Sequence, residues 1–187
     1  MTRAQPPRHL VLLGLRASGK STLGARLARE LGLPFVDLDD RTAVLLGARS
    51  AGEAFVAVGE PAFRDAEAAA LARVLADDAV VLALGGGTPT APGAADALRN
   101  ARARGCAFLV FLDPPIEAMS RRLTKDAGNR PTLTGRGVVE EIEEIAARRR
   151  PLYAALADRV VGGDVSVEDA KSEVLAAFAA PSDTTSS

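Results

Sequence analysis

A glycine-rich segment near the N-terminus has the residue types and spacing that bind phosphate groups. Residues 14–21 read G-L-R-A-S-G-K-S, which matches the pattern GxxxxGK[ST], between an apolar run (LVLL) and a helix-favouring run (TLGARLAREL). The glycines let backbone N–H groups converge on phosphate oxygens, and the following helix directs the positive end of its dipole at the same anion. Lys20 can reach the β- and γ-phosphates, and the Ser21 hydroxyl can ligate Mg²⁺. The segment predicts a nucleoside triphosphate site with Mg²⁺ as cofactor.

Two carboxylates at alternate positions follow the second apolar run of the chain. Asp37 and Asp39 come directly after Phe35–Val36, and ligands of open α/β sheets bind at the carboxyl ends of the strands. One carboxylate can orient Mg²⁺ through water while the other accepts a proton from an attacking hydroxyl. The alternative is that Asp39 or Asp40 only caps a helix over Arg41–Leu46. Spacing alone leaves both interpretations open.

A run of three glycines follows the third apolar run, AVVLAL. It is either a flexible turn or a place where backbone N–H groups approach a ligand more closely than any side chain would allow. Further candidates are the segment Phe63–Glu67 (FRDAE) and the segment Arg148–Tyr153 (RRRPLY). Arginines on helices are more often solvated than bound to a ligand, so these two segments need support from their combination with other motifs.

Apolar runs alternate with helical segments along the chain, and this alternation must position the candidate residues. The strand-like runs are Leu10–Leu13, Phe35–Val36, Ala79–Leu84, Ala107–Leu112 and Arg159–Val161. The helical segments are Ser21–Leu31, Gly52–Leu75, Ala91–Arg104, Pro115–Leu123 and Val138–Ala157. Continuous apolar runs suit parallel strands that are covered on both faces. We therefore predict an α/β fold with three α/β/α layers and a central parallel sheet of about five strands.

The domain organisation follows from the same pattern. We expect one domain over residues 1–180 and a disordered tail over residues 181–187 (PSDTTSS). Residues 125–137 (KDAGNRPTLTGRG) are polar and rich in glycine and arginine, so they are either a surface loop or a lid over the site.

Composition excludes several classes of function. The 187 residues carry 23 basic and 24 acidic side chains, a net charge of -1, which argues against broad nucleic-acid or membrane binding. No apolar run is long enough to span a bilayer and residues 1–9 lack a secretory signal, so we expect a cytoplasmic protein. Cys106 and His9 each occur once, which excludes an internal disulfide, a cysteine zinc site and a histidine-based triad. We interpret His9 as part of a leader before the first strand.

The motifs in combination resemble the shikimate kinase family. From about Leu10 to Val161 the chain carries, in order, GLRASGKSTLG, DLD, FRxxE, GGG, NRP and RxPLY. The resemblance implies a P-loop fold of the nucleoside monophosphate kinase type with a lid. It also implies a monomer that uses ATP to phosphorylate the 3-hydroxyl of shikimate, with ATP and shikimate as its ligands.

The resemblance also assigns residues to the two substrates. It implies nucleotide binding by Gly14, Arg16, Ala17, Ser18, Gly19, Lys20, Ser21, Thr22, Arg122 and Arg130. It implies acceptor binding by Asp39, Phe55, Phe63, Arg64, Gly85, Gly86, Gly87 and Arg149. Lys20, Asp39 and Arg130 would be catalytic, Ser21 would hold Mg²⁺ directly, and Asp37 would hold it through water. Arg136 is the other lid arginine that could take the place of Arg130.

The P-loop departs from the family pattern at one position, where Ala17 replaces the usual glycine. If that position needs a positive φ, alanine costs about 1 kcal/mol and can shift the loop. Two other functions stay open: a kinase of another hydroxy acid such as gluconate, and a shikimate-kinase-like domain that senses a ligand without turnover. The presence of Lys20, Ser21, Asp37 and Asp39 favours an enzyme.

Overall fold

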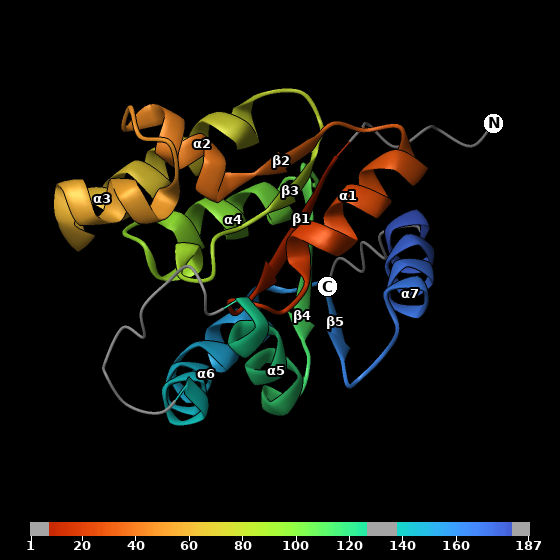
Figure 1. The fold of residues 1–187 in the computed structure, drawn as a ribbon. Coiled ribbons are helices and arrows are strands. Elements are labelled where there is room, and N and C mark those ends of the chain that lie inside the picture. The colour runs from red at the N-terminus through yellow and green to blue at the C-terminus, as the bar shows by residue number, and fades with distance from the viewer. Residues whose placement is uncertain (1–7, 127–137, 181–187) are drawn as a thin grey trace.

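Five parallel strands form the central sheet of the computed structural model, which describes residues 8–126 and 138–180 (Figure 1). The strands are β1 (His9–Gly14), β2 (Phe35–Asp37), β3 (Val81–Ala83), β4 (Ala107–Asp113) and β5 (Arg159–Gly162). Their order is β2-β3-β1-β4-β5, and all four neighbouring pairs are parallel. The predicted α/β class and the parallel sheet are confirmed. Because every strand runs the same way, their carboxyl ends meet at one edge of the sheet.

Helices cover both faces of this sheet. They are α1 (Lys20–Leu31), α2 (Leu38–Leu45), α3 (Ala51–Ala76), α4 (Ala94–Ala103), α5 (Ile116–Asp126), α6 (Val138–Leu156) and α7 (Val167–Ala179). Buried side chains of α1 and α7 pack on one face, and those of α3, α4 and α6 pack on the other, so the three predicted layers are confirmed. Within the described ranges, no helix combines the length and apolar character needed to cross a bilayer.

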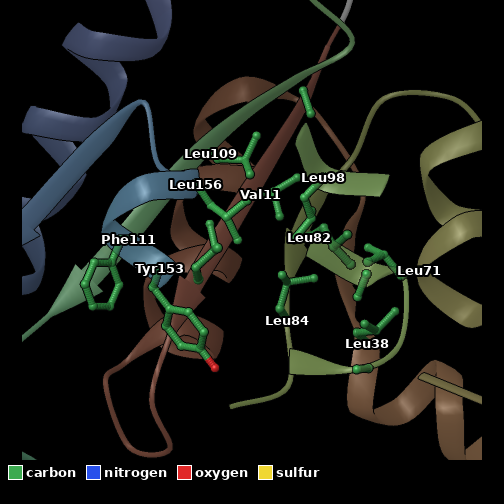
Figure 2. Packing of buried hydrophobic residues seen from close by; sticks show 14 of the residues in the cluster. Val11, Leu38, Leu71, Leu82, Leu84, Leu98, Leu109, Phe111, Tyr153 and Leu156 are labelled. Atoms are coloured by element: carbon green, nitrogen blue, oxygen red, sulfur yellow. The ribbon is translucent and has the colours of Figure 1, made fainter. Parts of the chain in front are cut away.

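The apolar runs are continuous because both faces of each strand are buried. In β1, Val11 and Leu13 join the core beneath α3, α4 and α6, whereas Leu10 and Leu12 join the core beneath α1 and α7. All four side chains are 0% exposed. Figure 2 shows the first of these cores, in which Tyr153 of α6 lies at one end. Burial of this extent on both faces fixes the carboxyl edge of the sheet as a rigid base for the loops that follow it.

Two predicted helices begin or continue differently from expectation. Residues 88–90 form a 3₁₀ turn and Gly93 precedes the helix with φ 74°, so α4 begins at Ala94 and not at Ala91. The helix predicted over Gly52–Leu75 is interrupted at Gly59, which has φ 77° and ψ 167°. Pro61 follows this break, in the first turn of the second segment, where a missing N–H costs no hydrogen bond.

The interpretation of His9 as part of a leader is wrong. His9 is the first residue of β1 and is 4% exposed, and its Nδ1 accepts a hydrogen bond from the Val80 N–H at 3.3 Å. Burial lowers the pKa of this imidazole below its ordinary value of 6.5. The neutral ring therefore extends the sheet pairing at its amino edge, remote from the loops at the carboxyl edge.

Candidate active site

The phosphate-loop segment lies between β1 and α1, as the motif predicts. Gly14 ends β1 with φ 156°, and Gly19 precedes α1 with φ 97°. A Cβ atom on Gly14 would lie 2.8 Å from the Leu112 carbonyl oxygen, so a side chain does not fit there. The loop passes the carboxyl ends of β1 and β4 and directs the N-terminus of α1 toward the space above them. This geometry is that of an anion site at a helix N-terminus.

Lys20 folds back onto this loop. Its Nζ donates to the carbonyl oxygens of Gly14 at 2.9 Å and Leu15 at 2.8 Å, and the residue is 8% exposed. Burial lowers the pKa of Lys20 to about 8, although the nearby carboxylates of Asp39 and Asp37 act to raise it. The ammonium group thus lies within the loop, beside the two carboxylates that the sequence singles out.

Ala17 adopts a left-handed backbone conformation with φ 62°, as no other non-glycine does in the part of the chain that the structure describes. The Cβ atom of an L-residue makes that region unfavourable by about 1–2 kcal/mol. Arg122 of α5 donates from Nη1 to the Ala17 carbonyl oxygen at 3.0 Å. Ala17 is therefore a strained residue in the middle of the loop.

We expect Ala17→Gly to raise the free energy of unfolding by about 0.5–1 kcal/mol, because relief of strain exceeds the extra entropy that glycine adds to the unfolded chain. Urea denaturation measures this change. The matched control is Ala69→Gly, on an exposed face of α3, which should destabilise the protein by about 0.5–1 kcal/mol. Equal destabilisation by both substitutions would contradict the strain.

Asp37 and Asp39, the carboxylates at the end of β2, have different roles. Asp37, and neither Asp39 nor Asp40, caps the next helix: its Oδ1 accepts from the Asp39 N–H at 3.1 Å, and α2 begins at Leu38 and not at Arg41. The other oxygen of Asp37 accepts from the Ser21 hydroxyl at 2.8 Å. The half-buried Asp39 side chain lies over Gly85, where a Cβ atom would come within 3.0 Å of its Oδ1. Capping therefore does not occupy Asp39.

A buried carboxylate holds Arg64. Glu67 is 1% exposed, and its Oε2 accepts from Arg64 Nη1 at 2.5 Å while its Oε1 accepts from the Thr88 hydroxyl at 2.8 Å. Burial acts to lower the pKa of Arg64, but the hydrogen bond to Glu67 and the charge of Glu67 outweigh it and raise that pKa. A Cβ atom on Gly87 would come within 3.0 Å of the Arg64 guanidinium. Arg64 therefore lies against the three-glycine loop as a fixed cation.

Arg149 reaches the same loop from α6. Its Nη1 donates to the Gly86 carbonyl oxygen at 2.8 Å, and the Tyr153 hydroxyl donates to the same oxygen at 2.8 Å. A Cβ atom on Gly86 would lie 2.9 Å from the Arg16 backbone nitrogen, so this loop also packs on the phosphate loop. The three glycines allow neighbouring groups to approach the backbone closely, so this loop is not merely a flexible turn.

An aromatic pair borders the same region. The rings of Phe55 and Phe63, both in α3, pack edge to face with their centroids 5.5 Å apart. Phe63 is buried and Phe55 is half-buried. Asp39, Arg64 and Arg149 thus lie around the three glycines. The aromatic pair adjoins them through Phe63, whose ring centroid lies 5.8 Å from the guanidinium carbon of Arg64.

A pocket of about 210 Å³ lies on the other side of the phosphate loop. Its lining comes from the phosphate loop, α1, the end of β4, Arg122 of α5 and the chain from β5 into α7: Ser18, Gly19, Thr22, Leu23, Leu112, Pro114, Arg122, Val161, Gly163, Val165, Ser166, Val167 and Ala170. The apolar walls beside a phosphate loop suit a planar base. Of the predicted nucleotide residues, Ser18, Gly19, Thr22 and Arg122 line this pocket, and Arg16 is exposed on the loop.

Several residues of the site escape sequence reasoning or lie outside the described ranges. The segment from Val161 to Ala170 was not predicted to contribute, although it follows the carboxyl end of a predicted strand and that position was a usable signal. Thr88 was not predicted, because it acts through a hydrogen bond to the distant Glu67 that no local pattern reveals. Tyr153 lies in the predicted segment Arg148–Tyr153, but its hydrogen bond to Gly86 was not predicted. Arg130, Arg136 and most of the predicted lid (residues 127–137), like the predicted tail, fall outside the described residues.

The family model and similar curated relatives agree on one family. A family model described as "Shikimate kinase" matches residues 16–179. A shikimate kinase of Rhodopirellula baltica is 40% identical over 175 residues, which cover 91% of this chain and 90% of that protein. One from Caulobacter vibrioides is 39% identical over 173 residues, which cover 90% of this chain and 81% of that protein. A solved structure, "Shikimate kinase from Acinetobacter baumannii in complex with shikimate", superposes with a TM-score of 0.82 at 27% identity and covers 93% of this chain and 94% of that one.

Proposed function

This chain belongs to the shikimate kinase family, whose members are ATP-dependent small-molecule kinases, and we propose that it transfers the γ-phosphoryl group of ATP to the 3-hydroxyl of shikimate. One structural observation supports this activity most directly. Two arginines from different helices, Arg64 and Arg149, meet at a glycine loop that packs directly on the phosphate loop. That arrangement holds an acidic acceptor beside the nucleotide phosphates.

The nucleotide lies across the N-terminus of α1. Backbone N–H groups of the loop bind the phosphates, and Lys20 exchanges its two carbonyl partners for the β- and γ-phosphate oxygens. The adjoining pocket takes the base, with Arg122 against one face of the ring. The apolar walls from Val161 to Ala170 exclude water from the other side.

The donors beside the phosphate loop fit Mg²⁺. Ser21 and Asp37 supply hard oxygen ligands, and their 2.8 Å hydrogen bond keeps them together at the point where α1 begins. Ser21 would hold the ion directly and Asp37 would hold it through water. When bound, Mg²⁺ neutralises charge on the β- and γ-phosphates.

The acceptor lies between the aromatic pair and the glycine loop. A planar carboxylate matches the paired N–H donors of Arg64 and Arg149, and each such charge-assisted hydrogen bond is stronger than a neutral one. Asp39 then faces the hydroxyl that attacks and accepts its proton. We assign Arg130 to the charge of the transferring phosphoryl group.

A coupled assay of ADP release tests the function. Shikimate, quinate, gluconate and water are each offered with ATP and Mg²⁺, and we expect rapid ADP release with shikimate only. Faster ADP release with gluconate would show that the protein is a kinase with an acceptor other than shikimate. Tight binding of shikimate without ADP release would instead favour the sensing domain.

The lowered pKa of Lys20 makes ATP binding depend on pH. In the free protein Lys20 loses its proton above about pH 8, and phosphate oxygens raise its pKa in the complex, so binding takes up a proton there. We expect ATP affinity to fall by up to about tenfold per pH unit above pH 8. Calorimetry in buffers of different ionisation enthalpy measures the uptake at pH 8.5 and at pH 6.5.

The control for this pH dependence is Lys20→Arg, since a guanidinium stays protonated throughout the range. This variant should show no proton uptake at either pH. Uptake that persists unchanged in Lys20→Arg would assign the titration to another group.

A further inference from the structure

Tyr153 is a buried tyrosine whose hydroxyl points out of the hydrophobic core. Its side chain is 0% exposed, and its ring packs edge to face on Phe111 with a centroid distance of 5.7 Å. Figure 2 shows the ring at the end of the core, with the oxygen directed away from the apolar side chains. That oxygen donates to the Gly86 carbonyl at 2.8 Å. The core therefore delivers one fixed donor to the glycine loop.

The Gly86 carbonyl oxygen accepts two hydrogen bonds, one from Tyr153 and one from Arg149, each of 2.8 Å. A carbonyl oxygen has two lone pairs, so both are used. The described residues contain no cis peptide bond, and in a planar trans peptide the N–H points opposite to the C=O. Fixing this oxygen therefore fixes the direction of the Gly87 N–H, which points away from α6, and Gly87 is the glycine that lies beside Arg64.

Tyr153 and Arg149, the two donors to Gly86, respond differently when the acceptor substrate binds. The half-buried Arg149 is the partner that an incoming carboxylate recruits, whereas the Tyr153 hydroxyl is enclosed and stays on the loop. Burial raises the pKa of Tyr153 to about 12, so the hydroxyl remains a donor at neutral pH. Tyr153 therefore holds the peptide whether or not Arg149 keeps its own bond to Gly86 when it binds the ligand.

We propose that Tyr153 is a positioning residue for the acceptor: its hydroxyl locks the Gly86–Gly87 peptide so that the Gly87 N–H and Arg149 converge on the acceptor carboxylate. The proposal rests on the proposed function for the identity of the acceptor. Tyr153 is enclosed in the core, and its hydroxyl acts through its hydrogen bond to Gly86.

Steady-state kinetics of Tyr153→Phe tests this role, because phenylalanine keeps the ring and removes only the donor. We expect KM for shikimate to rise about two- to tenfold, the effect of one lost neutral hydrogen bond, with kcat and KM for ATP within about twofold. The matched control is Phe111→Leu, which disturbs the packing of the same ring but leaves the donor. It should lower Tm without raising KM for shikimate selectively.

A spectroscopic arm separates this proposal from the proposed function. In protein labelled with ¹⁵N-glycine, Tyr153→Phe should shift the Gly87 amide resonance, which belongs to the same peptide unit, more than that of the remote Gly105. An unmoved Gly87 resonance overturns the lock, as does an equal rise in both KM values or an unchanged KM for shikimate. If the wild-type protein does not phosphorylate shikimate but Tyr153→Phe still shifts the Gly87 resonance, shikimate is not the acceptor, while the role of Tyr153 in holding the Gly86–Gly87 peptide is retained.

Discussion

Asp39→Asn is expected to lower kcat by about 10²–10⁴ while it changes KM for ATP far less, since asparagine keeps the shape of the side chain but cannot take the proton of the attacking hydroxyl. The structure strengthens this expectation. Asp37 is the residue that caps α2, so a change of charge at Asp39 removes no helix cap. Single-turnover and steady-state rates with saturating ATP and shikimate measure the effect.

The matched control for Asp39 is Asp40→Asn, one position along the same helix turn and exposed. Asp40→Asn makes the same chemical change beside the site and should leave kcat unaltered. If both variants turn over at the wild-type rate, Asp39 is not the base and another group must receive the proton.

Arg64→Ala is expected to lower kcat/KM for shikimate by about 30- to 4,000-fold, which corresponds to the roughly 2–5 kcal/mol of truncating one partner of a buried charge pair. ATP affinity should barely change. Arg64→Lys should not restore activity, because an ammonium group cannot present two parallel donors. It keeps a positive charge near the buried Glu67, so it also separates loss of recognition from loss of stability.

The methyl ester of shikimate completes this test. The wild-type protein should use the ester nearly as poorly as Arg64→Ala uses the acid, and Arg64→Ala should lose little more on the ester. Arg148→Ala is the matched control, since that arginine is exposed and pairs with Glu144 on the surface of α6. Equal penalties on acid and ester would show that Arg64 does not bind a carboxylate.

The parts of the site that sequence predicts are those in which local chemistry and strand direction decide the outcome. The GxxxxGK[ST] pattern requires a strand, a turn and a helix in succession, and β1 and α1 supply them. Residues at the ends of β2 and β3 share one edge because all strands are parallel. The combination of motifs indicates the shikimate kinase family, and the family model confirms it.

Other features depend on contacts between distant segments. The pattern S-x-x-D at Ser166–Asp169 marks the start of α7, but this helix was not predicted, and only the packing of Ala170 and Val174 on the sheet makes it part of the core. Hydrogen bonds such as Thr88 to Glu67 and Tyr153 to Gly86 join separate elements. Their geometry is set by how α3 and α6 pack, which spacing along the chain does not encode.

The strand order has a consequence for how the protein is made. Leu10 of β1 pairs with Val81 of β3, and Leu12 pairs with Val110 of β4. The central strand β1 is therefore synthesised before both of the strands that pair with it. At about 5–20 residues per second, a ribosome needs several seconds to add them. During that interval both hydrogen-bonding edges of a largely apolar strand lack their native partners, and such edges favour aggregation. Synthesis speed between β1 and β4 therefore bears on the yield of folded protein.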